Sequence, residues 1–496
     1  MKRLTLAVLI FFIASGAAYG ERKRAADFTF EAAQKQAYWY SLNNVAHLTM
    51  FSGMGKIMKG GGMTGIIEWL KGGGVKKAEL VKDMYMISSV YAEGDPHFIQ
   101  AVDLDNKRSM GWDRQKMDKT LNPSAQAFTI IKSVTKNFHR DYHETKDNQR
   151  IAIAMYPEAK EMAKLLVEKM IDDRGLFVTL SPDGKEVKPN PFDQVAVLWA
   201  FSDLALISSD PEVPPYNDVD LARWSSKMAD KAFNATKRLP PESIIDKAIA
   251  IEALGRYGAA IDDKVLRREA IRLILRYAEA LRKGSKKTIT EMGLSVYGLI
   301  EAFRVTGSPG FMKEALRIFN KDMESLWDKK AGIYANFKGS KRHVYTPFDV
   351  GAVLAALNSI AWFVVPPYDD PLDSGPDLAK KRYVKFFENA LVISGLQRAS
   401  GISLVERRYL DREARNHFAH PSLPQPEEGG GSFGIAPVYA SEVSFEDGKW
   451  AVTNERFNTK EAMFLATMSV ILNRHQVDSF IPVQRLMAKL LADVGI

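Results

Sequence analysis

The sequence contains no cysteine among its 496 residues. A chain without cysteine has no disulfide, no thiolate metal site and no covalently attached c-type haem, so its stability depends on packing. After the first twenty residues, the sequence also lacks any apolar run of the length that crosses a bilayer. Phosphate-binding loops, serine elbows and Cys/His nucleophile patterns are absent as well, and we expect no cofactor.

The first twenty residues are typical of a secretory signal peptide. Lys2 and Arg3 precede an apolar run from Leu4 to Ala14, and Ala18-Tyr19-Gly20 fits a small-x-small cleavage site. We therefore expect residues 1–20 to be removed, which leaves no transmembrane anchor in the mature chain. An uncleaved anchor is the alternative. The expected location is periplasmic or secreted.

The charge balance is only moderately basic. The formal net charge is +8, and removal of Lys2 and Arg3 with the signal peptide leaves +6. With 46% hydrophobic and 26% charged residues, the chain has an ordinary globular composition. No nucleic-acid-binding motif occurs, and nucleic acid is an unexpected partner for an exported protein. A polysaccharide or another anionic envelope component fits the charge.

Two segments of the chain repeat each other. "NPFDQVAVLWA" begins at Asn190 and "TPFDVGAVLAA" begins at Thr346. Each has a capping residue, then proline at the first helical position, then an acid at the third, Asp193 or Asp349. The repeat predicts two equivalent helix starts, and leaves open whether each Asp is a catalytic group or only a cap.

The same signature recurs along the chain, at Ser243…Asp246, Thr288…Glu291 and Asn458…Glu461, while Asn122-Pro123 has the cap without the acid. Each start opens a helix rich in small and apolar residues, which is typical of a buried helix, and a more amphipathic helix follows it. Six such pairs predict an all-α fold, a closed toroid of six helical hairpins over residues 122–496. In a closed ring, Asp193 and Asp349 face each other across one mouth.

Two regions fall outside the repeat. Residues 21–121 predict an N-terminal helical extension, a hairpin with glycine-rich turns that packs on the ring. Residues 399–457 interrupt the last repeat and predict a loop followed by a β-hairpin over one mouth.

This pattern resembles the six-hairpin (α/α)6-toroid superfamily, which includes glycoside hydrolases, polysaccharide lyases and sugar epimerases. The resemblance rests on the repeat number, the buried inner helices and the glycine-aromatic arm before a capped helix. It implies that substrate binds in the funnel where loops precede the inner helices, and that acids near those helix starts carry the chemistry. Asp193 and Asp349 match that location.

Hydrolysis of a glycosidic bond needs one protonated and one ionised carboxyl group. An Asp at a helix N-terminus is held ionised, which suits a base and opposes an acid. A separate acid is then needed, and Glu461, Glu291 and Asp113 are candidates; we favour Glu461. For substrate binding we predict Trp112 and Trp450, in polar loop-like contexts, and the arm residues Phe177 and Tyr334.

Histidine pairs give no complete metal site. His139 and His143 are four residues apart and His417 and His420 are three apart, but neither pair has a third ligand at a diagnostic spacing. We predict no metal.

Two functions remain open at this stage. One is an exported hydrolase or lyase that acts on an envelope or extracellular polysaccharide in the toroid funnel. The other is a non-catalytic exported toroid that binds a glycan or a protein partner as a cell-envelope assembly factor. An open funnel with two unlike carboxylates favours the enzyme, and a funnel filled by bulky side chains favours the binding protein.

Overall fold

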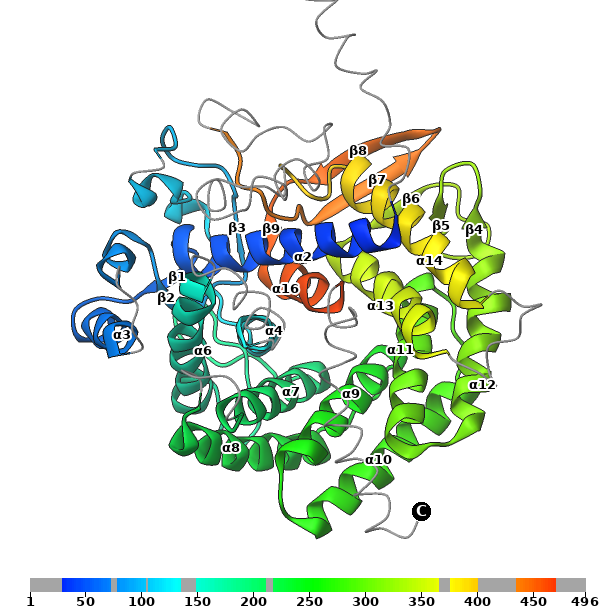
Figure 1. Ribbon diagram of the computed structural model, residues 1–496, viewed down its shortest axis with the longest axis horizontal. Coiled ribbons are helices and arrows are strands. Elements are labelled where there is room, and N and C mark those ends of the chain that lie inside the picture. Colours follow the sequence, from blue (N-terminus) through cyan, green and yellow to red (C-terminus); the bar gives the residue numbers. More distant parts are fainter. Residues whose placement is uncertain are drawn as a thin grey trace, which may run out of the picture.

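The computed structural model describes residues 29–72, 78–103, 106–134, 149–210, 217–364, 375–399 and 434–469. These residues form two concentric rings of helices, with small β-sheets at one edge (Figure 1). The predicted all-α toroid, and its resemblance to the six-hairpin superfamily, are confirmed by this architecture. Residues 1–20, the predicted signal peptide, lie outside the described residues.

Six helices of the described chain form the inner ring. In order these are α4 (Pro123–Ser133), α7 (Pro191–Ser208), α9 (Ile244–Ala260), α11 (Ile289–Thr306), α13 (Pro347–Phe363) and α16 (Thr459–Met468). Each packs against the next, and α16 packs against both α13 and α4, which closes the ring.

The outer ring covers the inner one with amphipathic helices. Its members are α6 (Gln149–Lys169), α8 (Val219–Arg238), α10 (Lys264–Lys283), α12 with η5 (Pro309–Arg317, Ile318–Met323), α14 with η7 (Gly375–Phe386, Phe387–Ile393), and α2 with η1 (Phe30–Ala46, His47–Phe51). On α10, for example, Ile274 and Leu281 face the core, while Val265 at the start of the helix is 71% exposed. One apolar stripe is enough for these helices because only one face is covered.

The sixth outer position is filled from the N-terminus. Helix α2 packs against α16, α14 and α4, and the Ser41 hydroxyl donates to the carbonyl oxygen of Ala466 at 2.9 Å. The sequence predicts residues 21–121, which include α2, as an extension that packs on the ring, and the last residues of the predicted ring, 470–496, lie outside the described residues. In the described residues, α2 covers α16 on the outside of the ring.

The starts of the inner helices follow the predicted caps. Reciprocal capping boxes form at Ser243 and Asp246, at Thr288 and Glu291, and at Thr346 and Asp349. Asn122 caps α4 without an acid, as its sequence predicts.

Glycine allows two inner helices to approach closely. A Cβ atom at Gly293 of α11 would lie 2.8 Å from the carbonyl oxygen of Ala352 in α13, a distance that real Cβ atoms essentially never show. Because the obstacle is backbone, a larger residue would force the two helices apart.

We expect Gly293→Ala to lower the free energy of unfolding by about 1–3 kcal/mol, since overpacking outweighs the better helix propensity of alanine. Gly310→Ala in α12 is the matched control, because its Cβ would meet nothing within 4 Å. That variant should be neutral or more stable by up to about 1 kcal/mol. Urea unfolding checks both, and equal stability of the two variants would contradict the close approach.

The strands form four small antiparallel sheets within the described residues. They pair β1 (Gly55–Ile57) with β2 (Ile87–Val90), β3 (Glu93–Gly94) with β9 (Phe457–Asn458), β4 (Trp327–Asp328) with β5 (Ile333–Tyr334), and β6 (His343–Tyr345) with β7 (Glu442–Glu446) and β8 (Lys449–Asn454). The pair β7 and β8 is the predicted β-hairpin.

Shorter elements complete the N-terminal part. They are α3 (Gly61–Gly72) and the 3-10 turns η2 (Ala78–Asp83), η3 (Lys107–Met110) and η4 (Arg114–Lys116), with η6 (Glu324–Leu326) further on.

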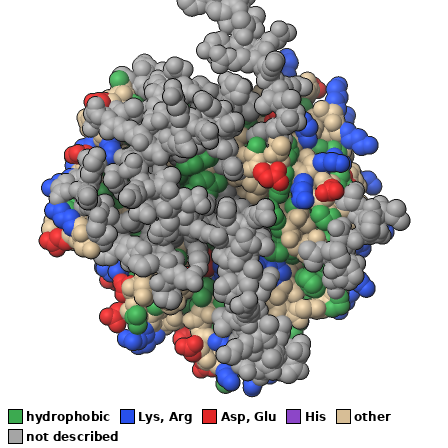
Figure 2. Space-filling view, viewed as in Figure 1, with side chains coloured by type: hydrophobic (Ala, Val, Ile, Leu, Met, Phe, Trp, Pro, Cys, Tyr) green, Lys and Arg blue, Asp and Glu red, His purple; other side chains and the backbone are tan. Residues whose placement is uncertain are grey.

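The described helices include none that is long and apolar enough to cross a membrane. Lys and Arg side chains are spread around the edge of the face in Figure 2, with Asp and Glu among them.

Candidate active site

The N-terminal ends of the inner helices meet at one mouth of the toroid. Three of them carry the predicted catalytic acids at the same helical position, the third: Asp193 on α7, Asp349 on α13 and Glu461 on α16. The residues beside the two Asp, Phe192 and Phe348, have ring centroids 6.0 Å apart. The ring therefore brings α7 and α13 together across its centre at this mouth.

Asp193 is buried and fully engaged. It is 1% exposed, and its Oδ1 accepts hydrogen bonds from the backbone N–H of Ser124, at 3.2 Å, and from the Ser124 hydroxyl. Its Oδ2 accepts from Asn190 Nδ2 at 2.5 Å. Burial raises the pKa of Asp193, while the bonds from Ser124 and the charge of Lys460 act in the opposite direction. This carboxyl joins α7 to the start of α4.

Asp349 repeats that arrangement on the other side of the ring. Its Oδ2 accepts from the backbone N–H and the hydroxyl of Thr346, both at 3.0 Å, and its Oδ1 accepts from the Thr290 hydroxyl at 2.5 Å. Thr290 on α11 and Ser124 on α4 hold the same second helical position. Each Asp thus binds its own helix start and a hydroxyl of the neighbouring inner helix, but Asp349 is half-buried where Asp193 is buried.

Glu461 differs from both Asp residues. Asn458 caps α16 by accepting from the Glu461 N–H at 3.1 Å, but its Nδ2 donates to Glu93 Oε1 at 3.0 Å. Burial, and next the negative charge of Asp349, raise the pKa of Glu461 to about 7, against the opposing effects of Lys460 and the Thr346 side chain. Glu461 therefore has a protonated fraction at neutral pH.

Phenyl rings fill the centre of the toroid below these acids. Phe464 stacks on Phe348 with centroids 4.1 Å apart and meets Phe128 edge-on at 5.3 Å. Phe128 also packs against Phe192 at 5.9 Å. Lys460 Nζ lies 4.3 Å from the centroid of Phe192. We call these four rings the phenyl cluster; it packs four inner helices together below the acids.

Most of the predicted substrate-binding aromatics lie in the core. Trp112 and Phe177 are each 1% exposed and Tyr334 is 0% exposed. Trp112 packs edge-on against Phe457, and the Tyr334 hydroxyl donates to Glu324 Oε1 at 3.0 Å. Trp450 on β8 is half-buried, against Phe445. Substrate binding by these residues stays a prediction, and their burial favours Trp450.

The alternative acids have structural contacts. Glu291 Oε2 accepts from the backbone N–H groups of Lys287, at 2.7 Å, and Thr288, at 3.1 Å. Asp113 caps η4 by accepting from the Gln115 N–H at 2.9 Å. These contacts give both groups a structural role at a helix or turn start.

Sequence reasoning missed a charged cluster in the later turns of three inner helices. Asp203 on α7, Glu252 and Arg256 on α9, and Glu301 and Arg304 on α11 have side chains that are at most 17% exposed. Arg256 lies 2.7 Å from Glu252 and 3.7 Å from Asp203, and Arg304 lies 2.6 Å from Glu301. We call these five residues the buried ion-pair cluster. The signal was present, because opposite charges three or four residues apart interrupt otherwise apolar helices.

Metal ligation finds no support in the described ranges, where no group of three His, Asp or Glu side chains could hold an ion. The two histidine pairs, His139 with His143 and His417 with His420, lie outside those ranges.

No model of a known protein family matches the chain, and no curated protein matches its sequence. Solved structures with a similar fold include a D-mannose isomerase, with TM-score 0.48, 10% identity and coverage of 82% of this chain and 97% of the other. A cellobiose 2-epimerase from Bacillus thermoamylovorans has TM-score 0.44 and 12% identity over 77% and 92% of the two chains. A cellulase from C. cellulolyticum has TM-score 0.45 and 10% identity over 90% and 99%.

Proposed function

We propose that the chain is an exported carbohydrate-active enzyme that breaks glycosidic bonds of an envelope or extracellular polysaccharide at the mouth of the toroid. In this proposal Glu461 is the general acid and Asp349 is its partner carboxylate. Asp193, buried and bonded to Ser124 and Asn190, has a positioning role.

The observation that carries the proposal is the difference between two neighbouring carboxyl groups. Thr346 donates to Asp349 at 3.0 Å, and its side chain also lowers the pKa of Glu461, so one residue lies against both acids. Burial and the charge of Asp349 raise the pKa of Glu461 to about 7. Pairs of titratable groups whose environments separate their pKa values are typical of acid–base catalysis.

Two reactions use such a pair. In hydrolysis, the protonated Glu461 gives its proton to the glycosidic oxygen as the bond to the sugar carbon breaks, and Asp349 takes a proton from the attacking water. In elimination, a carboxylate removes a carbon-bound proton next to an acidic group of the sugar, and the acid protonates the departing oxygen. The residues fit both reactions, and the product distinguishes them.

A non-catalytic toroid that binds a glycan or an envelope protein is the second candidate. The phenyl cluster favours it, because bulky side chains from four inner helices pack together at the centre of the ring. The hydrogen bonds that Asp349 accepts from Thr346 and Thr290 also serve the fold.

The test is turnover by Glu461→Gln on a panel of neutral and acidic polysaccharides. New reducing ends report hydrolysis, and the ultraviolet absorbance of an unsaturated product reports elimination. We expect the variant to lose about 100-fold in turnover, the lower end of what a general acid contributes. Asp246→Asn, the matched acid at the third position of α9, should retain activity. Unchanged turnover in Glu461→Gln would contradict the role of Glu461 as the general acid, and no turnover of any polymer by the wild type would favour the binding protein.

Unfolding of the wild type and of Glu461→Gln at several pH values shows that the variant is folded and tests the raised pKa of Glu461. The pKa of Glu461 is raised from 4.5 to about 7 in the folded state, so folding favours its protonated form. Its contribution is present below pH 4.5 and is lost as the pH rises to about 7. Glutamine mimics the protonated form, and the variant should gain stability relative to the wild type, by up to about 3 kcal/mol, only as the pH rises through this window.

A further inference from the structure

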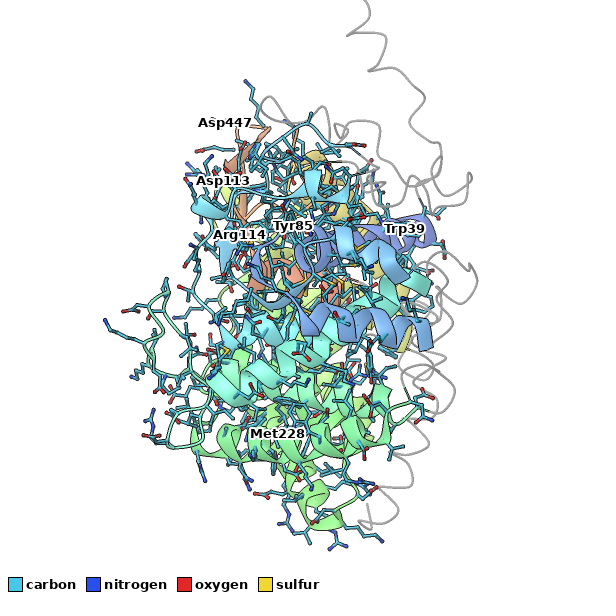
Figure 3. The ribbon with its side chains drawn as sticks, turned by 90° about the vertical axis from the view of Figure 1, so that its left-hand side faces the viewer. Trp39, Tyr85, Asp113, Arg114, Met228 and Asp447 are labelled. Atoms are coloured by element: carbon cyan, nitrogen blue, oxygen red, sulfur yellow. The ribbon has the colours of Figure 1, made fainter. Side chains whose placement is uncertain are left out.

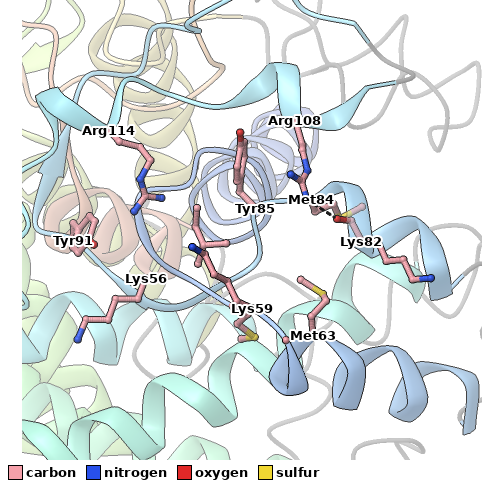
Figure 4. A pocket seen from close by; sticks show the side chains of 12 residues that line it. Lys56, Lys59, Met63, Lys82, Met84, Tyr85, Tyr91, Arg108 and Arg114 are labelled. Atoms are coloured by element: carbon pink, nitrogen blue, oxygen red, sulfur yellow. Dashed lines mark hydrogen bonds between the residues drawn. The ribbon is translucent and has the colours of Figure 1, made fainter.

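A basic pocket lies in the N-terminal part of the chain, between the β1–α3 segment and the turns η2, η3 and η4. Its volume is about 760 Å³, within the range of small-molecule sites. Five cationic residues and a tyrosine are among those that line it, Lys56, Lys59, Lys82, Arg108, Arg114 and Tyr85; the side chains of Lys56 and Lys82 extend outward in opposite directions (Figure 4). No acidic residue is among those that line it.

The two arginines are held by neutral partners. Arg114 donates to the carbonyl oxygens of Gly53, at 2.9 Å, and Gly55, at 3.2 Å. Arg108 donates to the carbonyl oxygen of Lys82 at 3.3 Å, and its guanidinium carbon lies 5.8 Å from the centroid of the Tyr85 ring. These contacts fix the guanidinium groups without neutralising them, which prepares the pocket for an anion.

The lysines add charge that the protein does not compensate. In the described part of the chain, none of the five cationic side chains forms an ion pair with a carboxylate. Asp113 lies beside Arg114 in the sequence, but its carboxylate caps η4 through Gln115. The pocket therefore carries a local excess of positive charge, which attracts polyanions.

Apolar surfaces alternate with these charges. Tyr85 is half-buried between Arg108 and Arg114 (Figure 4), and Met63 and Met84 also line the pocket. Aromatic and thioether faces pack against the C–H faces of sugar rings, while the cations reach the carboxylates that such rings carry.

One lining residue of the pocket is hydrogen-bonded to the start of the helix that carries Glu461. Tyr91, one of the lining residues, accepts a hydrogen bond at its carbonyl oxygen from the Thr459 hydroxyl at 2.6 Å. Thr459 is the first residue of α16, two positions before Glu461, and its N–H donates to the Ala92 carbonyl at 2.9 Å. One side of the pocket is thus hydrogen-bonded to the start of α16, the helix that carries the proposed general acid.

We propose that this basic pocket binds an acidic glycan, a polymer of uronic-acid sugars, and so sets the substrate class of the mouth. The nature of the ligand rests on the proposed function, while the charge and shape of the pocket stand on its own residues. The ligand carboxylates pair with the lysines and arginines, and the sugar rings lie against Tyr85.

The experiment measures the dissociation constants of the mature protein for polygalacturonate and alginate, and for methyl-esterified polygalacturonate, which lacks the charge. We expect binding to an acidic polymer that weakens as salt is added, and at least tenfold weaker binding of the esterified form. The Lys56→Gln/Lys59→Gln variant should bind about tenfold more weakly than the wild type.

Lys227→Gln/Lys231→Gln is the matched control. It removes the same charge from exposed positions on α8, and Met228 of that helix lies well away from Tyr85 and Arg114 in Figure 3. This variant should bind like the wild type. Absence of binding to both acidic polymers, equal binding of the esterified form, or equal loss in the two lysine variants would overturn the proposal, as would pocket-dependent binding to anionic lipid vesicles alone.

Binding and turnover separate the two proposals. Glu461→Gln should retain the binding of acidic polymer while losing turnover. If Glu461→Gln keeps full turnover but the pocket variant loses binding, the catalytic assignment fails and the glycan pocket stands.

Discussion

Replacement of Arg256 by alanine is expected to lower the free energy of unfolding by about 3–5 kcal/mol, the usual cost of leaving buried charges without their partner. Arg256 lies between two acids of the buried ion-pair cluster, Glu252 at 2.7 Å and Asp203 at 3.7 Å. Both acids have side chains that are at most 14% exposed. Without the guanidinium group, their charges face each other in the interior of the ring.

The loss should depend on pH, with a sign set by Asp203. Burial raises the pKa of Asp203 to about 6, and the charge of Arg256 opposes that rise. Removal of the Arg256 charge raises the folded-state pKa of Asp203 further. The folded variant therefore keeps a proton on Asp203 at pH values where the unfolded chain has released it. The stability deficit should therefore be smallest near about pH 5 and largest above about pH 7.

Urea unfolding at several pH values measures this effect. Arg282→Ala on α10 is the control, because Arg282 pairs with Glu279 at 2.6 Å on the exposed side of an outer helix, and surface pairs of this kind contribute little. If Arg256→Ala is no less stable than Arg282→Ala, the inner helices do not depend on the buried ion-pair cluster.

Phe464→Ala is the second large expected effect, a loss of about 3–5 kcal/mol. Phe464 is 0% exposed, stacks on Phe348 and meets Phe128 edge-on. The truncation leaves a cavity among rigid helices, because a Cβ atom at Gly351 would already lie only 3.1 Å from Phe464. Inner helices this close cannot collapse far into the space.

Phe337→Ala removes the same atoms from a side chain that is 52% exposed, and it should change stability little. Thermal and urea unfolding of both variants separate loss of a core ring from loss of a surface ring. A small effect of Phe464→Ala would mean that the phenyl cluster is loosely packed and that the pore can open.

The repeat and the caps were predictable because they are local. The proline at Pro191 or Pro347 and the acid two positions later are read directly from neighbouring residues, and the structure uses them as helix starts. The same local signal cannot reveal the second contact of each Asp. The hydroxyl donors Ser124 and Thr290 belong to other helices, 69 and 59 residues away.

Long-range packing explains what the sequence did not predict. Trp112 occurs in a polar stretch, "MGWDRQK", yet it is buried because Phe457, distant in the sequence, covers it. The raised pKa of Glu461 likewise depends on Asp349, which ring closure alone places nearby. The basic pocket collects residues from four separate short elements, so no single stretch of sequence indicates it.

The position of α2 in the outer ring affects how the protein folds during its synthesis. This helix leaves the ribosome among the first residues, but its inner partner, α16, is made more than 400 residues later, as the 425-residue separation of Ser41 and Ala466 shows. Until then α2 can contact α4 and α14 but not α16, and at roughly 5–20 residues per second this delay lasts tens of seconds. The nascent chain is thus an open arc, and the ring closes only when α16 has been made.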